Sequence, residues 1–422
     1  MMLRSAPGPL VLSITTAIVQ LILLSGQVVQ AAPSRFVHPG VFLDRPRLDF
    51  IRTQVRRGQE PWASAYNAML AFPMAALNRT ATPYENVECG SNSIPNIGCT
   101  PERQDALASY AMSLAWYVSR ERKYADKAVE YLNAWGSMLK SHNGSNAPLQ
   151  TGWSAASWAR SAEIIRWTYP GWKRSDITQF ETMLRTAYVP QLLLGSNSNG
   201  NWELVMMEAA IGISVFLSDG SIYDQALTRF LSRIPAYLYL ESDGPLPLIS
   251  QYSTSSIPTQ ERLIRYWQYQ TTFVDGLSQE TCRDFVHSGY GISSISHAAE
   301  TLRIQGLDLY KRTSSVTATT YSLVTNSTQS TPVKLATRLA KALEFHAQYE
   351  TSGGNLPAPN WLCNGTLNLG LGPVTEVPFM ALHSRAGWEL PYTELVTLAQ
   401  RPAGTNYLFV GWETLTSAGR CE

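Results

Sequence analysis

The sequence predicts an all-α fold of the (α/α) solenoid or toroid class, in which paired antiparallel helices form a single domain. Three observations predict it. Apolar residues recur at helical spacing along most of the chain, short stretches of Gly, Pro and Ser separate the periodic segments, and alternating runs typical of strands are few. The segments have similar lengths and no charged coiled-coil face, which favours helix pairs stacked around a shared core. A length of 422 residues would allow two or three domains, but no clear linker interrupts the pattern.

The N-terminal segment, residues 1–31, has the pattern of a secretory signal peptide. Arg4 precedes a largely apolar run over 10–24, and Val29-Gln30-Ala31 forms a cleavage site with small residues. We expect cleavage after Ala31, which leaves a secreted domain over 32–422. An uncleaved signal anchor is the alternative, although Ser, Thr and Gln within the run make it a poor membrane span. No later stretch approaches the roughly 18 apolar residues that a span needs, so we expect no membrane association after cleavage.

The expected helices follow one another along the chain. In the segment 103–118 apolar residues such as Leu107, Ala111 and Leu114 keep the i, i+3, i+4, i+7 spacing, with Thr100 as N-cap and Pro101 at the first helical position. A second stripe runs over 128–139. Further helices are expected at 45–57, 60–72, 154–168, 175–194, 202–217, 221–239, 259–274, 280–305, 333–349 and 391–400. Two longer loops remain: a Ser- and Pro-rich candidate lid at 241–258 and a Ser- and Thr-rich, glycosylated surface loop at 312–332.

Composition excludes several classes of function. Lys and Arg number 33 against 32 Asp and Glu, so the chain has no basic excess and nucleic acid is excluded as a partner. The sequence lacks an H-E-x-x-H motif, a paired C-x-x-C motif and a phosphate-binding glycine loop, and we expect neither a metal nor a cofactor. A G-x-S-x-G motif is also missing, which disfavours serine-esterase chemistry. Aromatic residues make up 10%, and some of them could serve as flat platforms for a ligand.

Cysteines and glycosylation signals agree with secretion. Cys89 and Cys99 bracket a turn-rich loop and form the first expected disulfide, and Cys363 with Cys421 is the expected second pair. Cys282 is then left as a buried free thiol, although spacing alone does not establish connectivity. Four N-x-S/T acceptors are candidate glycosylation sites, namely Asn78, Asn143, Asn326 and Asn364.

The strongest polar pattern is Arg283, His287 and Tyr290, spaced i, i+4 and i+7. This spacing places the three side chains within about 60° of one helix face. Phe285 and Ile292 lie on the opposite face, which should be core. The combination of residue types favours a cleft, and an internally hydrogen-bonded or exposed face is the alternative. Two nearby glycines could distort the helix.

Other polar residues stand on otherwise apolar helices. His346 and Tyr349 are spaced i, i+3, and Asn201 stands at the start of an apolar helix, where it could cap the helix or bind a substrate carboxylate. The segment 146–160 brings tryptophans together with an amide and a guanidinium, a combination suited to sugar binding. A buried histidine, a helix cap and tryptophans that pack between helices are the alternatives. The residues of this segment are Gln150, Trp153, Trp158 and Arg160.

Several strings resemble a known family. ECGSNSIPNIGCT, NAPLQTGWSAASWARSAEIIR, GNWELVMMEAAIGISVFLSD, ETCRDFVH, LEFHAQY and GWETLTSAG look like secreted fungal proteins of the alginate-lyase-like superfamily, which includes polysaccharide lyase families five and thirty-eight. The similarity runs from about residue 36 to 419. It implies an (α/α) toroid, or incomplete barrel, and cleavage of a uronic-acid polysaccharide such as alginate or glucuronan by β-elimination.

The resemblance also implies a catalytic group. By motif match it consists of Asn201, His287 and Tyr349, with Arg283 matching the Arg of the RD-x-x-H string. Asn201 and Arg283 would bind the uronate carboxylate, His287 would remove the C5 proton and Tyr349 would protonate the leaving O4. Alternatively, Tyr349 serves as both base and acid, and His287 helps to neutralise the carboxylate. The remaining expected substrate contacts are Gln150, Trp153, Trp158, Arg160, Trp202, Tyr290, His346, Glu376 and Arg385.

The chain departs from the family pattern at two places. Relatives carry an Asn after the Glu that matches Glu376, where this chain has Met380, and often a Gln where it has Gly289. These changes concern substrate contacts and therefore the preferred uronate.

Taken together, the sequence predicts a monomeric, secreted polysaccharide lyase whose partner is an anionic polysaccharide. One rival is an inverting glycoside hydrolase, which would need two carboxylates about 6.5–9.5 Å apart. Its candidates are Glu203, Glu208, Asp284 and Glu376, and their spacing selects no pair. The other rival is an inactive carbohydrate-binding protein.

Overall fold

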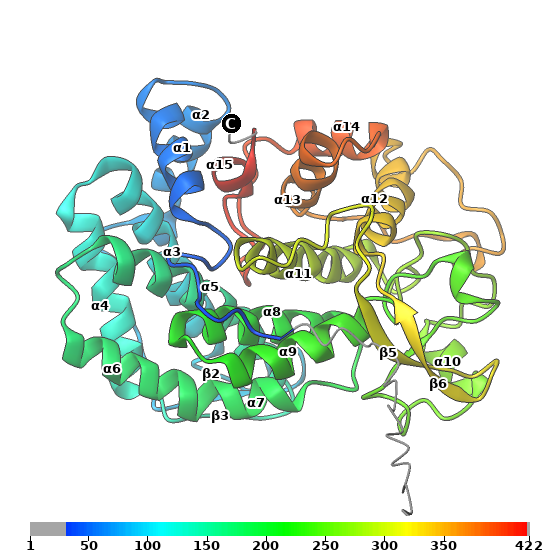
Figure 1. Cartoon of the computed structure of the whole chain (residues 1–422). Coiled ribbons are helices and arrows are strands. Elements are labelled where there is room, and N and C mark those ends of the chain that lie inside the picture. Colours follow the sequence, from blue (N-terminus) through cyan, green and yellow to red (C-terminus); the bar gives the residue numbers. More distant parts are fainter. Residues whose placement is uncertain (1–30, 420–422) are drawn as a thin grey trace, which may run out of the picture.

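The computed structural model describes residues 31–419, and most of this range is helical (Figure 1). The expected signal peptide lies outside the described residues except for Ala31. Four long helices make up the inner layer: α3 (Cys99–Ser119), α5 (Ala147–Thr168), α8 (Gly200–Leu217) and α11 (Phe285–Ile304). Each packs on the next in that order, and most residues of each are buried. The inner helices therefore have polar and apolar residues alike in the interior.

Shorter amphipathic helices cover this inner layer. They are α4 (Arg122–Met138), α6 (Arg174–Met183), α7 (Val189–Leu194) and α9 (Gly220–Arg233). In α4 the buried residues Ala128, Leu132 and Trp135 form the stripe expected from the sequence. A π-helical turn, Leu184–Tyr188, joins α6 to α7 within the segment expected as one helix. The helix expected over 221–239 ends at Arg233.

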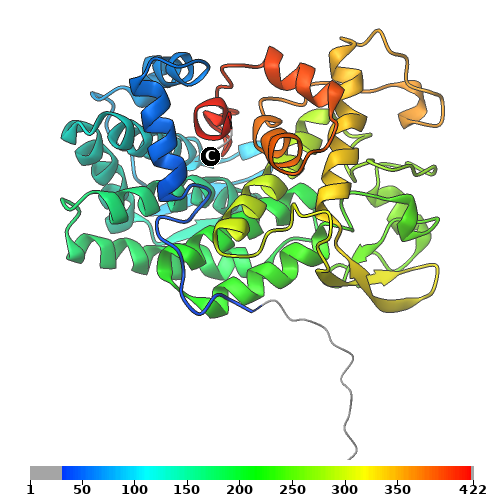
Figure 2. The same cartoon turned by 45° about the horizontal axis from the view of Figure 1, so that its top comes forward.

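The two ends of the chain meet and close the ring. The last helices, α12 (Leu335–Thr351), α13 (Glu376–Phe379), α14 (Pro391–Ala399) and α15 (Glu413–Ser417), follow α11. Contacts run from α11 to α13, from α13 to α15, and from α15 to α1 (Arg45–Arg56) and α2 (Trp62–Ala71). Because α1 also packs on α3, the helices complete a toroid, and Figures 1 and 2 show α15 between the N-terminal helices and α13. The predicted fold class is confirmed.

Two small sheets stand beside the helices. In the first, β1 (Asn86–Cys89) pairs antiparallel with β2 (Asn96–Ile97) and parallel with β3 (Ser141–Asn143). In the second, β4 (Ile249–Ser250), β5 (Thr317–Ser322) and β6 (Ser327–Pro332) are antiparallel, with Ser322 opposite Ser327. The expectation of a loop over 312–332 is wrong for most of that segment, because its threonines have high β-propensity and pair as a hairpin.

Two expected helices begin or end elsewhere. α10 (Gln260–Tyr266) covers only the first half of the segment expected at 259–274. α11 begins at Phe285 and not near residue 280, because the Asp284 side chain accepts the backbone N–H of His287 at 2.7 Å and acts as the N-cap. Arg283 therefore lies in the turn before the helix. One helix among the described residues, α8, is apolar and long enough to cross a membrane, contrary to expectation, but 89% of it is buried inside the fold.

The disulfides correct one prediction. Cys89–Cys99 forms as expected. The second disulfide joins Cys282 to Cys363, so the expectation of a Cys363–Cys421 bond with a free Cys282 is wrong. Cys282 lies in the turn before α11, where it meets the loop that follows α12, a proximity that sequence spacing does not reveal. Cys421 lies outside the described residues. The four candidate glycosylation sites are all exposed, as such sites must be.

Candidate active site

The N-terminal ends of α8 and α11 lie together, joined by the turn 278–284. The backbone N–H of Gly200, the first residue of α8, donates to Gln279 Oε1 at 2.8 Å. Ser278 Oγ and Ser288 Oγ lie 2.9 Å apart, which ties the same turn to α11. Asn201 is the second residue of α8 and not its N-cap, so its side chain has another role.

Glu280 lies at the centre of this cluster and is fully buried. The Nδ2 of Asn201 is 2.7 Å from both carboxylate oxygens of Glu280, and the Arg283 guanidinium donates to Oε1 at 3.0 Å. The Tyr237 hydroxyl donates to Oε2 at 3.1 Å. Burial raises the pKa of Glu280 above its ordinary value, and these donors oppose the rise. The sequence does not single out Glu280, which the expected helix over 280–305 would place at its first position and not in a buried turn.

Tyr237 is held between the two helices. A Cβ added to Gly200 would come 2.3 Å from the Tyr237 ring, and a Cβ added to Gly291 would come equally close, at 2.3 Å. The Tyr237 hydroxyl also donates to the backbone carbonyl of His287 at 3.3 Å. Gly291 thus allows close packing and leaves α11 continuous, which corrects the expectation that it distorts the helix. Gly289 likewise allows close packing, because a Cβ added to it would come 2.2 Å from the carbonyl oxygen of Leu371.

His287 is paired with Asp284 at the first turn of α11. Its Nδ1 lies 2.7 Å and 2.8 Å from the two carboxylate oxygens. The His287 side chain is 28% exposed and that of Asp284 15%. Burial acts to raise the pKa of Asp284, but the hydrogen bonds from His287 outweigh it and the pKa lies below its ordinary value. Asp284 is therefore ionised at neutral pH, and it orients the ring.

Tyr290 lies next to His287, with ring centroids 5.4 Å apart. It is partly buried, and burial together with Asp284 raises its pKa. The Arg283 side chain is 33% exposed and paired to Glu280. His287 and Tyr290 are on α11 and Arg283 precedes it, and the expectation that the three share a cleft stays a prediction.

Tyr349 and His346 lie on α12, beside Phe285. The ring of Tyr349 packs 6.4 Å from Phe285 and 5.8 Å from Phe345, and its edge lines a cavity of about 180 Å³ under the loop 354–369. Burial raises the pKa of Tyr349. His346 has no exposed surface, and its Nε2 is 3.1 Å from Thr281 Oγ1. The expected substrate contact by His346 is therefore wrong, and its contact with Thr281 supports the turn 278–284.

Several expected substrate contacts are buried in the core, so they cannot touch a polysaccharide. Trp158 is fully buried against Trp135 and Phe180. Arg160 is 2% exposed and is held by Glu208, His297 and the carbonyl of Phe409. These two predictions are wrong because neighbouring segments of the fold cover this part of α5.

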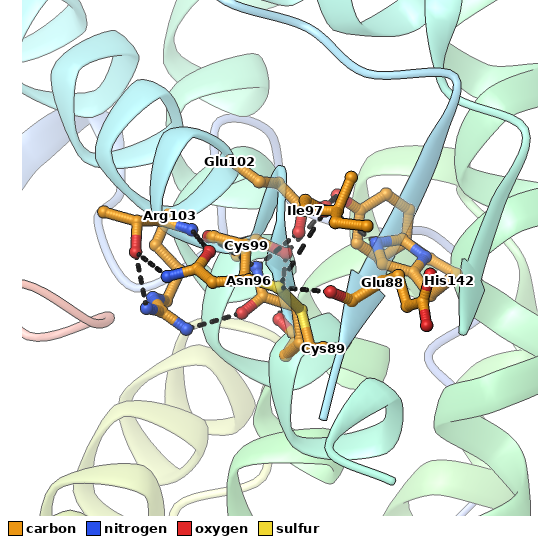
Figure 3. Close-up of a disulfide and its surroundings, with 12 residues drawn as sticks. Glu88, Cys89, Asn96, Ile97, Cys99, Glu102, Arg103 and His142 are labelled. Carbon is orange, nitrogen blue, oxygen red and sulfur yellow. Dashed lines mark hydrogen bonds and ion pairs between the residues drawn. A yellow bond between two sulfur atoms is a disulfide. The ribbon is translucent and has the colours of Figure 1, made fainter. Parts of the chain in front are cut away.

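Gln150 is also buried, 1% exposed, and its predicted substrate contact is wrong too. Its amide accepts from Arg103 at 2.7 Å and donates to the carbonyl of Cys99 at 3.0 Å. Figure 3 shows Arg103, Glu102 and His142 around the Cys89–Cys99 disulfide. Trp153 is partly buried with the Arg103 guanidinium 5.3 Å from its ring, and Trp202 is partly buried against the main core.

Glu376 and Arg385 each form an ion pair within the fold. Glu376 is 2% exposed and accepts two hydrogen bonds from Arg401, at 2.9 Å and 2.6 Å, so its predicted substrate contact is wrong. Arg385 pairs with Glu300 near the C-terminal end of α11. It lines a cavity of about 270 Å³ together with Arg303 and Met380.

The carboxylates proposed for a hydrolase all have cationic or histidine partners. Glu203 binds Arg229 and Arg233, Glu208 binds Arg160, Glu376 binds Arg401, and Asp284 binds His287. This pairing engages each of the four carboxylates within the fold. Within residues 31–419 no group of three His, Cys, Asp or Glu side chains is arranged to hold a metal ion.

Comparisons with known proteins agree with this architecture. A family model described as alginate lyase matches residues 100–332, more than half of the chain. The crystal structure of alginate lyase A1-III from Sphingomonas species A1 superposes with a TM-score of 0.59 at 14% identity, covering 94% of this chain and 100% of that one. A histidine-to-alanine variant of the same lyase, complexed with a tetrasaccharide, gives a TM-score of 0.54 at 15% identity, covering 94% and 99%.

A further solved structure extends the likeness to another organism. An alginate lyase from Bacteroides ovatus gives a TM-score of 0.52 at 12% identity, covering 91% of this chain and 100% of that one. At these identities the likeness is one of fold. No curated protein matches the chain.

Proposed function

The chain belongs to the alginate lyase family and is a polysaccharide lyase, and from this premise we propose that it cleaves a uronic-acid polysaccharide of the alginate or glucuronan type by β-elimination. A lyase of this kind removes the C5 proton of a uronate and expels the O4 substituent. The proton becomes acidic only when the neighbouring carboxylate is neutralised. The site must therefore supply a cation or strong donor, a base and an acid.

Arg283 is the proposed partner of the substrate carboxylate. One guanidinium nitrogen is engaged by Glu280, and the side chain keeps 33% of its surface exposed. A planar guanidinium suits a carboxylate because it can donate two parallel hydrogen bonds. Asn201 is 1% exposed and its Nδ2 contacts go to Glu280, so its contact with the uronate carboxylate stays a prediction and we place it first in the network that holds Arg283.

His287 is the proposed base, and its contact with Asp284 is the observation that carries the proposal. The ionised Asp284 accepts the Nδ1 proton, so in the neutral ring Nε2 is the nitrogen with the free lone pair. The partly exposed ring can present that nitrogen to a C5 proton. Histidine is the side chain that enzymes most often use as a general base.

Two tyrosines are candidates for the acid that protonates O4. The sequence resemblance selects Tyr349, and contact with His287 favours Tyr290. Each phenol is protonated at neutral pH, since burial raises the pKa of both. We propose Tyr290 as the acid beside His287 and retain Tyr349 as the second candidate. One solved structure offers a parallel: a tyrosine-to-phenylalanine variant of the A1-III lyase is complexed with a tetrasaccharide.

The proposal is tested by an ultraviolet absorbance screen of the purified mature chain. The substrates are polymannuronate, polyguluronate, glucuronan and glycosaminoglycans. β-Elimination leaves a C4–C5 double bond, so we expect an absorbance gain with one of the first three polymers. New reducing ends without the gain would establish a hydrolase, and binding without either product would establish an inactive binding protein.

Two variants test the base. We expect His287→Ala to abolish the absorbance gain and Asp284→Asn to lower kcat by at least about 10²-fold, because the amide would stabilise the wrong ring tautomer. His38→Ala is the matched control, since His38 pairs with Glu163 near the C-terminal end of α5. Wild-type rates in the His287 variant would remove that residue from the base role.

Secretion also belongs to the proposal. The signal-like segment over 1–31, the two disulfides and the four exposed acceptor asparagines support an extracellular enzyme that meets its polymer outside the cell.

A further inference from the structure

Glu280 is a buried carboxylate that no part of the elimination chemistry uses directly. It has no exposed surface, so it cannot contact a polysaccharide. It nevertheless accepts hydrogen bonds from residues of three different segments: Asn201 on α8, Tyr237 after α9 and Arg283 in its own turn. A buried charge is costly unless it is paired and hydrogen-bonded, and here every partner belongs to the candidate active site or supports it.

The position of Glu280 is itself tightly determined. The Tyr237 ring fills a slot between Gly200 and Gly291, where a Cβ on either glycine would come within 2.3 Å of it. Its hydroxyl therefore reaches Glu280 Oε2 from a fixed direction. On the other side, Thr281 is held by the buried His346. The turn that carries Glu280 is thus fixed against α8, α11 and α12 at once.

Arg283 depends on this carboxylate for its direction. One guanidinium nitrogen donates to Glu280 at 3.0 Å, while Asp284 is 3.9 Å from Nε. An arginine with a third of its side chain exposed has many rotamers, and a single strong ionic partner removes most of them. The nitrogen atoms that do not contact Glu280 are then free to face outward to a substrate carboxylate.

We propose that Glu280 is a positioning residue: its buried carboxylate, oriented by Tyr237, holds the Asn201 amide and the Arg283 guanidinium in the geometry in which Arg283 receives the substrate carboxylate. The inference rests on the proposed function for its kinetic consequence. Its structural consequence, the restraint of Arg283, is independent of the reaction.

The kinetic test is Glu280→Gln, which keeps the size of the side chain and removes its charge. We expect kcat to fall roughly 10²-fold with KM changed less than about threefold, because a misplacement near 1 Å costs about that much in the chemical step. Glu163→Gln is the matched control, because Glu163 is also a buried carboxylate and lies near the C-terminal end of α5. This variant should keep wild-type kcat and KM. Wild-type kcat in the Glu280 variant would overturn the proposal.

A double variant separates positioning from general damage. If Glu280 acts through Arg283, then Glu280→Gln combined with Arg283→Gln should be no slower than Arg283→Gln alone. Losses that multiply would show that the two residues act independently, and the proposal would fail. If Glu280→Gln does not fold, Tyr237→Phe replaces it, because the phenyl ring still fills the slot. That variant should fold normally and lose several-fold in kcat, and an unchanged kcat would also overturn the inference.

A chemical test needs no activity. Phenylglyoxal modifies arginines, and peptide mass mapping can follow Arg283 alone. We expect Arg283 to react several-fold faster in Glu280→Gln than in the wild type, and equal rates would contradict the restraint. An inactive wild type would refute the proposed function, whereas the modification rates would still decide the role of Glu280.

Discussion

Two histidines show how burial sets the role of a residue type in this protein. His287 is partly exposed and paired with an ionised Asp284, which suits proton transfer. His346 is fully buried, accepts from Thr281 at Nε2 and donates from Nδ1 to the carbonyl of Ala342 at 2.7 Å. Burial lowers the pKa of His346 from 6.5 to about 4, so it is neutral in the folded protein at neutral pH.

This lowered pKa predicts a pH-dependent stability. The unfolded chain takes up a proton on His346 near pH 6.5, before the folded chain does at about pH 4, so the stabilisation is complete above pH 6.5 and is lost as the pH falls toward 4. We expect the loss to be about 3 kcal/mol. Urea denaturation at several pH values should show it in the wild type and not in His346→Gln, which cannot titrate. Parallel curves for the two proteins would contradict the prediction.

The two candidate acids are also distinguished at the residue scale. Tyr290→Phe and Tyr349→Phe each remove one hydroxyl and leave packing intact, so both variants should fold with unchanged thermal midpoints. We expect Tyr290→Phe to lose at least about 10²-fold in kcat, the effect of a general acid, and Tyr349→Phe to lose less. Initial rates of absorbance gain measure both. The opposite order would assign the acid to Tyr349, as the family resemblance implied.

At the scale of elements, the helix starts place the site. Asp284 ends the turn 278–284 and begins α11, which puts His287 in the first turn of the helix and Arg283 outside it. Gly200 and Gly291 let α8 and α11 approach Tyr237 closely. Periodicity predicted that both helices exist and that Phe285 and Ile292 are core, which the structure confirms. It could not predict these close approaches, because they depend on a residue from a third segment.

The disulfide at this turn leads to a prediction about elements. Cys282–Cys363 spans 81 residues and adjoins Arg283, whereas Cys89–Cys99 spans 10 and lies on another part of the ring. Replacing Cys282 and Cys363 by Ser should cost about 2–4 kcal/mol of stability and lower kcat. The matched pair Cys89→Ser and Cys99→Ser should cost less stability, since it closes a shorter loop, and leave kcat near wild type. Denaturation and rate measurements test both, and non-reducing peptide mapping that found Cys363 bound to Cys421 would contradict the pairing.

At the scale of the whole molecule, the closed ring explains why a nearly neutral chain can serve an anionic polymer. The formal net charge is +1, and several arginines form ion pairs with buried carboxylates, among them Glu203, Glu208 and Glu376. Positive charge toward a substrate therefore needs to be local, at Arg283. Salt screens charges that are far apart much more than groups in direct contact, so a local guanidinium–carboxylate contact depends on geometry more than on net charge.

Processing of the whole chain is predicted as well. Expressed in a eukaryotic host, the protein should appear in the medium with Ala32 as its first residue, because the signal pattern ends at Ala31. Enzymatic deglycosylation should lower its mass and convert the acceptor asparagines, which are exposed in the fold, to aspartate. N-terminal sequencing and mass mapping check these outcomes. Retention of the first 31 residues in a membrane fraction would instead establish a signal anchor.

The sequence by itself determined the class of the fold, the approximate helices, the Cys89–Cys99 loop and the cluster around His287. These features are local, because helical periodicity, turn composition and short motifs all depend on residues that are close together in the sequence. The tertiary structure alone decided that Trp158, Arg160 and His346 are core, that Cys282 pairs with Cys363, and that Glu280 organises the site. Burial and pairing depend on which segments of the ring meet. The sequence spacing between residues that are far apart in the chain does not reveal which segments these are.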